Sequence, residues 1–298
     1  MKLENQWMQE YLDYCKDDLK LSDETLRSYS VDLKQFYRIS EQNNDHIESY
    51  MNYLNENLKE KSIIRKLNVM RSYFDYLNKA EKCTINPFSK STKAYKTPEV
   101  KAETIPNDFI KAILETARHR LETATTSSKK KKTARDLAMI ELLLTTGIRP
   151  SELYNLKTSH VQLNQGILII ESQDYKNRTV PIQSTSTIKV LNYYYHLNQE
   201  NIENYGFFFL SSHNEPMKDY QFRKILALLK KETPTIPTDF IVTPLMFRNT
   251  FIKMMLESGM SVNMIKKLTG LKQINATLLY QYGPKKEEIG GIDIINML

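Results

Sequence analysis

The chain has 298 residues, which exceeds the usual size of one domain, and its 8 Gly and 10 Pro leave few turn residues, so two mainly helical domains with a little β are expected. The 42 Lys and Arg against 35 Asp and Glu give a formal charge of +7, which favours a polyanionic partner, although such an excess also simply keeps a protein soluble. Cys15 and Cys83 are far apart and have no His or Cys at ligand spacing, so neither a disulfide framework nor a zinc site is indicated, and a reducing cytoplasm fits best. No apolar run reaches membrane-spanning length, so a membrane protein is not indicated.

Four amphipathic helices are predicted in the N-terminal part of the chain. Apolar residues recur there at intervals of three and four, in segments that begin near Trp7, Leu26, Ile47 and Ile63. Ser22 offers an N-cap oxygen to the second of these helices. The four together predict a small bundle.

Several basic side chains of the fourth predicted helix lie away from its apolar stripe, namely Lys61, Arg65, Lys66 and Arg71. They are candidates for contact with DNA phosphates. A solvated helix face explains them about equally well, so the pattern leaves both interpretations open.

A linker is predicted after this bundle. From Asn86 to about Pro106 the apolar period disappears, and Ser, Thr, Lys and Pro take over. We therefore expect an N-terminal domain over residues 1–88, a linker over 89–105 and a second domain with a C-terminal tail over 106–298.

The second domain is expected to begin with a helix around Phe109 to Leu114, followed by a loop over the polar residues 127–132. Lys129 and Lys130 in this stretch are candidates for contact with a DNA backbone. Lysine runs are more often merely solvated and mobile.

A joint between two helices is predicted at Arg149. A buried helical stripe over residues 137–144 ends at Gly147, where a left-handed C-cap residue belongs. Pro150 suits the first position of a new helix with Glu152 in its first turn. The Arg149 guanidinium is then expected to project freely from the joint.

A β-hairpin is predicted next. Residues 167–171 and 178–182 have the composition of short strands around a polar turn, with Lys176 at its tip.

The C-terminal part is predicted to be helical. Thr243 and Pro244 open one helix and Ser261 opens a shorter one, a pair that also fits a helix-turn-helix. A last short helix over 275–280 and a tail from Gly283 follow, and this tail is a candidate for contact with a neighbouring subunit.

No Walker loop, dinucleotide fingerprint or paired metal carboxylates occur, so neither a cofactor nor metal-dependent phosphoryl chemistry is indicated. Phosphodiester transfer without a metal needs another source of positive charge. Planar arginine forks can bind the non-bridging phosphate oxygens while a positioned side chain attacks in line.

Three segments carry a resemblance to one family. Residues 143–153, Leu-Leu-Thr-Thr-Gly-Ile-Arg-Pro-Ser-Glu-Leu, resemble the first arginine box of the tyrosine recombinases, the phage-integrase and Xer-like enzymes. Residues 243–251 resemble the second arginine box, and residues 265–280 resemble the nucleophile segment. Order and spacing also agree. The resemblance covers nearly the whole chain and implies a SAM-like core-binding domain, which clamps DNA together with a mostly helical catalytic domain carrying a small β-hairpin sheet.

The resemblance implies a role for each matched residue. Arg149 and Arg248 would hold the scissile phosphate, Glu152 would support Arg149, and Tyr280 would form a covalent 3′-phosphotyrosine link. A 5′-hydroxyl would then reseal the DNA, without ATP, a metal or another cofactor. Taken singly, an arginine at a helix joint is often only a cap and a tyrosine near a helix end is often core.

The sequence departs from the family pattern at three places. Leu245 stands where the second box carries histidine, and Leu271 stands where the family has His or Trp. The hairpin lysine, a general acid in the family, falls on Gln173 by ungapped spacing. We expect Lys176 to take this role with a shortened turn, because an amide is a poor proton donor.

Three functions remain open from the sequence. The first is an active site-specific recombinase of a mobile element or phage, a tetramer on double-stranded DNA in the cytoplasm and nucleoid, with no small-molecule substrate. The second is a catalytically weakened or silent relative that binds DNA as an accessory or regulatory protein. The third is a helix-turn-helix regulator built on residues 243–270, for which Arg149 would be dispensable.

Overall fold

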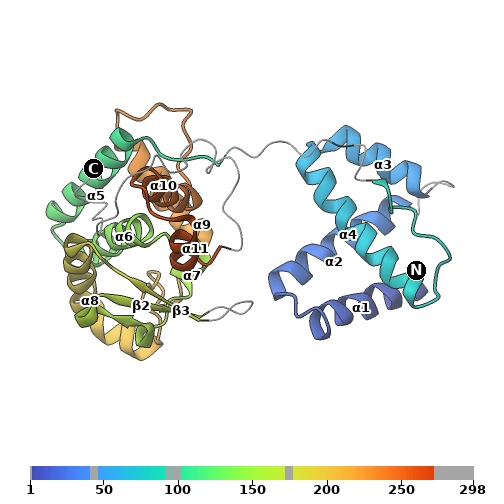
Figure 1. Ribbon diagram of the computed structural model, residues 1–298, viewed down its shortest axis with the longest axis horizontal. Helices are drawn as coiled ribbons and strands as arrows, with labels where there is room; N and C mark the ends of the chain where they lie inside the picture. The colour runs from blue at the N-terminus through green and yellow to red at the C-terminus, as the bar shows by residue number, and fades with distance from the viewer. Residues whose placement is uncertain (1, 41–45, 92–94, 96–101, 172–176, 272–298) are drawn as a thin grey trace. The chain divides into compact units, whose positions relative to one another are not determined.

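The computed structural model describes residues 2–40, 46–91, 95, 102–171 and 177–271. They form eleven α-helices and one small sheet, which confirms the expected mainly helical fold (Figure 1). The chain divides into two compact units, Met1–Val100 and Lys101–Leu298, and the division falls inside the predicted linker. No helix in the described part of the chain is both long and apolar enough to cross a membrane.

The N-terminal unit is a bundle of four helices around an aromatic core. Phe36 meets Tyr50 edge to face with ring centroids 5.1 Å apart, a geometry that aromatic pairs prefer. Phe88, beyond the last helix, folds back and is fully buried in the same core. The helices are α1 (Lys2–Asp17), α2 (Asp23–Ser40), α3 (His46–Asn57) and α4 (Glu60–Lys79).

A buried ion pair joins α2 to α4, and it corrects one prediction. The Lys66 side chain does not lie away from the core, since its ammonium donates to Asp32 at 2.6 Å and to Gln35 at 2.7 Å. Asp32 is 1% exposed, and a buried carboxylate must be paired. The helical periodicity predicted an exposed Lys66 side chain, because it gives no information about a partner on another helix.

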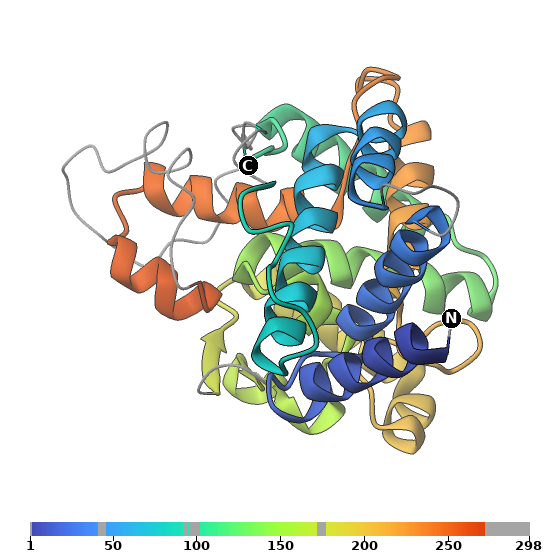
Figure 2. The same ribbon diagram turned by 90° about the vertical axis from the view of Figure 1, so that its right-hand side faces the viewer.

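The C-terminal unit is built around one buried helix, α6. Residues 133–146 of α6 are all buried, and α5, α8 and α10 pack against it (Figures 1 and 2). No element was predicted over residues 183–242, where α8 and α9 lie. The helices are α5 (Asn107–Glu122), α6 (Ser127–Thr146), α7 (Pro150–Tyr154), α8 (Thr185–Tyr205), α9 (Asp219–Lys231), α10 (Pro244–Glu257) and α11 (Val262–Thr269).

The polar stretch 127–132 is helical, so the prediction of a loop there is wrong. α6 begins at Ser127, and the Thr126 hydroxyl caps it by accepting from the Lys129 amide at 3.2 Å. Lysine is a good helix former, and the apolar residues that follow anchor the helix in the core. Composition alone therefore misled at this point.

The sheet lies beside α8 and has three antiparallel strands in the order β1-β2-β3. They are β1 (Val161–Gln162), β2 (Ile167–Ile170) and β3 (Arg178–Pro181). The predicted hairpin is β2 and β3, with Ile170 opposite Arg178, and β1 was not predicted. The hairpin tip at 172–176 lies outside the described residues.

Candidate active site

The helix joint at Arg149 is formed as the sequence predicts. Gly147 ends α6 with a φ of +60°, and a Cβ there would lie 2.2 Å from Phe251, so both the backbone and the packing require glycine. Pro150 starts α7 at its first position. Arg149 is the N-cap residue, and its backbone amide donates to the Glu152 carboxylate at 2.7 Å.

The Arg149 guanidinium does not project freely, which corrects the expectation from the sequence. Its Nη1 donates to Glu152 at 2.8 Å and its Nη2 donates to the carbonyl of Gly270 at 2.5 Å. Glu152 lies three residues away, a spacing at which side chains on a helix meet. The side chain keeps 31% of its surface exposed, so an incoming anion can still reach it.

Glu152 is held by a second arginine that sequence reasoning missed. Arg178, at the start of β3, donates from Nη1 and Nη2 to the two carboxylate oxygens at 2.9 and 2.7 Å. Burial alone raises the pKa of Glu152, but the hydrogen bonds from Arg178 and then from Arg149 outweigh it, and the pKa lies below its ordinary value. The only signal in the sequence was a basic residue at the start of a strand.

Arg248 reaches the same place from α10, which starts at Pro244 as predicted. The side chain is 3% exposed, with Nη1 on the Gly147 carbonyl at 2.6 Å and Nη2 on the Thr269 carbonyl at 2.8 Å. Burial, and after it the charge of Arg149, lowers the pKa of Arg248 to about 9. The guanidinium therefore remains protonated at neutral pH.

The three arginines converge on the C-terminal end of α11. The carbonyls of Leu268, Thr269 and Gly270 accept from Arg178, Arg248 and Arg149, respectively. The last carbonyls of a helix lack partners within it and carry the negative end of its dipole, so cations are stabilised there. Tertiary folding thus places two predicted arginines, Glu152 and one further arginine around a single point, with a net positive charge.

Tyr280, Lys176 and Gln173 lie outside the described residues. Leu245 is 52% exposed on the first turn of α10, and Leu271 is partly buried against the core. Among the described residues, no histidine hydrogen-bonds to Glu152 or Arg248.

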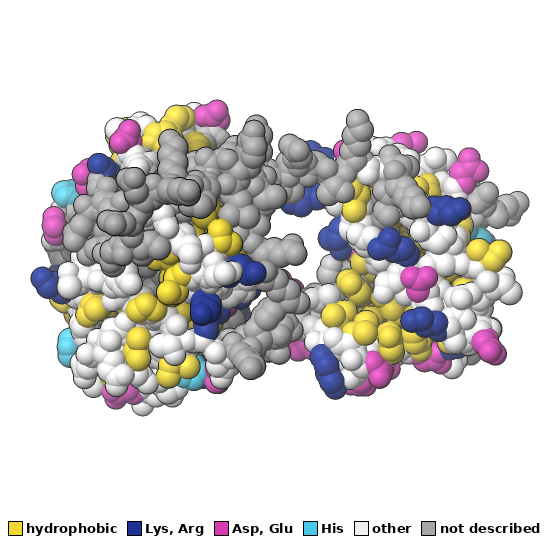
Figure 3. Space-filling view, viewed as in Figure 1, with side chains coloured by type: hydrophobic (Ala, Val, Ile, Leu, Met, Phe, Trp, Pro, Cys, Tyr) yellow, Lys and Arg dark blue, Asp and Glu magenta, His cyan; other side chains and the backbone are white. Residues whose placement is uncertain are grey.

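The predicted DNA-contact residues differ in their surroundings. Lys61 is exposed on α4, whereas Arg65 is half-exposed and binds Asp32. Arg71 donates to Asn68 at 3.0 Å. Basic side chains are spread among hydrophobic ones on the face of the N-terminal unit shown in Figure 3.

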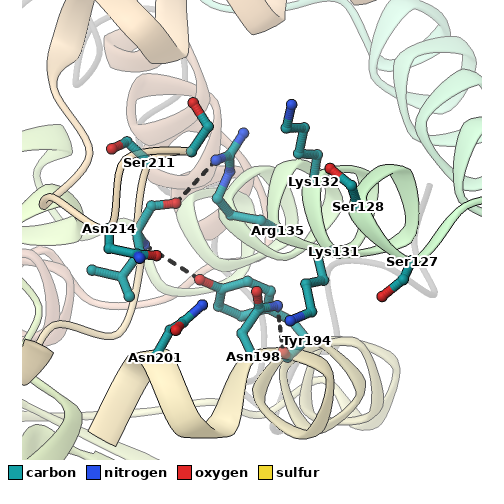
Figure 4. A pocket seen from close by; sticks show the side chains of 12 residues that line it. Ser127, Ser128, Lys131, Lys132, Arg135, Tyr194, Asn198, Asn201, Ser211 and Asn214 are labelled. Carbon is teal, nitrogen blue, oxygen red and sulfur yellow. Dashed lines mark hydrogen bonds between the residues drawn. The ribbon is translucent and has the colours of Figure 1, made fainter. Parts of the chain in front are cut away.

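A cleft of about 490 Å³ opens near the N-terminal end of α6 (Figure 4). Lys131, Lys132 and Arg135 line it, while Lys129 and Lys130 lie on the exposed first turn nearby. Arg135 is already paired, through the Leu210 carbonyl and Asp136. At 1.5 Å per residue the helix separates Arg135 from Gly147 by about 18 Å, so this cleft is distinct from the arginine site.

Two family models match the chain. The model described as Phage integrase family covers residues 104–286, and the model described as Phage integrase, N-terminal SAM-like domain covers residues 8–81. The first is nearly coextensive with the C-terminal unit, and the second lies within the four-helix bundle.

Relatives and solved structures agree with these matches. A tyrosine recombinase of Agathobacter rectalis is 32% identical over 278 residues, which are 91% of this chain and 90% of the relative. The tyrosine recombinase XerC of Staphylococcus aureus strain JH9 is 26% identical over 289 residues, covering 93% and 92%.

The fold is similar to that of a lambda integrase dimer bound to a COC′ core site, with a TM-score of 0.67, 17% identity and coverage of 97% of this chain and 80% of that one. It is also similar to the Tn1549 transposon integrase in complex with circular intermediate DNA, with a TM-score of 0.64, 16% identity and coverage of 95% and 96%. The extent of the catalytic family model and the identity of the Agathobacter relative show that the chain belongs to the phage integrase family of tyrosine recombinases.

Proposed function

We propose that the protein is a site-specific DNA recombinase that cuts and rejoins DNA through a 3′-phosphotyrosine intermediate. The observation that carries this proposal is the convergence of Arg149 and Arg248 beside Glu152. Their guanidiniums can bind the non-bridging oxygens of a phosphodiester, on which negative charge develops during transfer. Both now bind backbone carbonyls, which are oxygen acceptors as a phosphate would be.

In the proposed reaction the Tyr280 oxygen forms a bond to phosphorus while the bond from phosphorus to the 5′-oxygen breaks. Lys176 donates a proton to the departing 5′-oxygen. The phenol proton passes to water, because leucine at position 245 offers no base. A 5′-hydroxyl then attacks the phosphotyrosine and reverses these steps, so the bond energy is conserved and no ATP is required.

The proposed partner is double-stranded DNA, bound by a tetramer of this chain that assembles through contacts of the C-terminal tail with a neighbouring subunit. In support, the lambda integrase neighbour is a dimer on a core site and the Tn1549 neighbour is bound to circular intermediate DNA. Like that transposon protein, the chain would serve a mobile element or phage, acting on cytoplasmic or nucleoid DNA.

A suicide substrate tests the proposal. DNA nicked close to the cleavage point loses its 5′-hydroxyl fragment after attack, which traps the covalent complex. The expected result is a protein–DNA adduct on a denaturing gel for the unaltered chain and none for Tyr280→Phe. An adduct that persists in Tyr280→Phe would contradict the assigned nucleophile.

A second function is favoured by Leu245 and Leu271, which place two apolar side chains where the family offers imidazole or another donor. The chain would then bind DNA as a silent accessory or regulatory protein. Sequence-specific binding without any adduct would select this function. A helix-turn-helix regulator has less support, because it gives Arg149 no role, whereas Arg149 and Arg248 are both held at the C-terminal end of α11.

A further inference from the structure

Arg178 belongs to the arginine cluster, since it binds both Glu152 and the end of α11, although it matches none of the predicted catalytic residues. Its side chain is only 12% exposed. All three guanidinium nitrogens donate, Nε to the Leu268 carbonyl at 2.8 Å, and Nη1 and Nη2 to Glu152 at 2.9 and 2.7 Å. Each of the three nitrogens thus donates within the protein, and the side chain supports other residues of the site.

The first residue it serves is Glu152. Each carboxylate oxygen accepts twice, Oε1 from the Nη1 atoms of Arg149 and Arg178, and Oε2 from the Arg149 amide and Arg178 Nη2. The planar fork of Arg178 fixes the plane of the carboxylate. Without this fork Glu152 can rotate, and Arg149 loses the fixed acceptor that sets the direction of its guanidinium.

The second element it serves is the end of α11. Gly270 has a φ of +66°, and a Cβ at this position would lie 2.8 Å from Arg178 Nη1. Glycine therefore fits here more easily than any other residue, and it lets the backbone lie directly against the guanidinium. Arg178 holds the Leu268 carbonyl in the same turn.

We propose that Arg178 is the positioning residue of the site, which orients Arg149 through Glu152 and holds the C-terminal turn of α11 against the cluster. The catalytic consequence of this role rests on the proposed function, whereas the orientation of Arg149 does not. Lysine cannot replace Arg178 fully, because its single nitrogen cannot reach both carboxylate oxygens and the Leu268 carbonyl in one plane.

The first experiment measures the order of the Arg149 side chain without DNA. In protein labelled with isotopic nitrogen in arginine, the Nε–Hε signal of Arg149, assigned by its absence in Arg149→Lys, reports fast motion of the guanidinium. We expect a rigid signal in the unaltered chain, a mobile one in Arg178→Met, and an intermediate one in Arg178→Lys. The matched control is Arg223→Met, which removes an exposed arginine paired with Asp219 on α9.

Circular dichroism confirms that each variant is folded, and if Arg178→Met is not, Arg178→Lys provides the same test. An Arg149 signal that stays as rigid as in the unaltered chain would overturn the proposal, whatever the protein does to DNA. A wild-type chain that forms no adduct would contradict the proposed function alone.

The second experiment is a double-mutant cycle on the rate of adduct formation at saturating DNA. Misplacement of a catalytic group by about 1 Å lowers rates by about 10²-fold, which is the loss expected for Arg178→Met, with DNA affinity changed less than about threefold. In a Glu152→Gln background the same substitution should add less than about threefold, because both act on Arg149 by one route. Full multiplication of the two losses would show that Arg178 acts independently of Glu152, against the proposal.

Discussion

Both units of the protein hold a largely buried carboxylate between two cationic side chains, but the two clusters have different surroundings. In the N-terminal unit Asp32 binds Arg65 and Lys66, which are neighbours on α4, and the cluster joins two helices. In the C-terminal unit Glu152 binds Arg149 and Arg178, which come from a helix joint and a strand. The same pairing chemistry is therefore used in both.

The two clusters differ because the C-terminal one contains a third arginine, Arg248, and because backbone carbonyls accept from its arginines. Arg248 adds a buried positive charge to the C-terminal cluster, and the carbonyls at the C-terminal end of α11 that hold the three guanidiniums carry only partial charge. The N-terminal cluster has one cation in excess, whereas the C-terminal cluster has two. The C-terminal cluster, with two excess positive charges on guanidiniums that bind neutral carbonyls, is suited to binding an anion. The N-terminal cluster, whose charges are more nearly balanced, stabilises the contact between α2 and α4.

The largest expected effect separates the clusters by function. Replacement of either phosphate-binding arginine, as Arg149→Ala or Arg248→Lys, should lower the rate of adduct formation by about 10²- to 10³-fold, because a preorganised donor to the developing charge is lost. Single-turnover cleavage of a suicide substrate at saturating DNA measures it. An unchanged rate in both variants would remove the C-terminal cluster from the chemistry.

The converse substitution is Asp32→Asn. It leaves Lys66 charged and buried without its carboxylate, so the free energy of unfolding of the N-terminal unit should fall by about 3 kcal/mol, as when one partner of a buried pair is removed. Urea denaturation followed by circular dichroism gives this value. If folded Asp32→Asn protein also loses adduct formation at saturating DNA, the assignment of this cluster to stability is wrong.

The pH dependence of stability sharpens the same contrast. The pKa of Glu152 is lowered in the folded chain, so the carboxylate stabilises the fold fully at a pH above its ordinary pKa of 4.5. This contribution is lost as the pH falls through the lowered pKa of the folded chain. Relative to Glu152→Gln, the unaltered chain should be more stable by about 2 kcal/mol near neutral pH. The two unfolding curves should converge in acid, and a constant gap would contradict the shift.

The smallest expected effect compares two lysines of α4. If Lys61 contacts a phosphate, Lys61→Gln should reduce the slope of log affinity against log salt by about 0.9 with little change in stability. Lys66→Met should instead lower stability and leave the slope unaltered, since Lys66 is buried on Asp32. Gel-shift titrations over a range of salt concentrations distinguish the two, and equal slopes for all three proteins would exclude Lys61 from the interface.

Much of the arginine site was predictable because local rules govern its parts. A left-handed glycine at 147, proline at 150 and glutamate at 152 specify the joint without reference to the rest of the chain. Residues 167–182 predict a hairpin by the same kind of rule, as Pro244 predicts a helix start. These are short-range preferences of backbone and side chain, so the amino-acid order is sufficient.

Local rules failed where the partner lies elsewhere in the fold. The helix over 127–132 is stabilised by the buried stretch of α6 that follows it, and Lys66 is buried by an aspartate on α2. Arg178 gained its role only when β3 was brought against Glu152 and the end of α11. The sequence by itself determined the helical content, the hairpin and the two arginine boxes. Only the tertiary structure decided which charges became buried and which arginines share one carboxylate, because a buried charge is tolerated only beside a partner, and that partner is supplied by packing between distant segments.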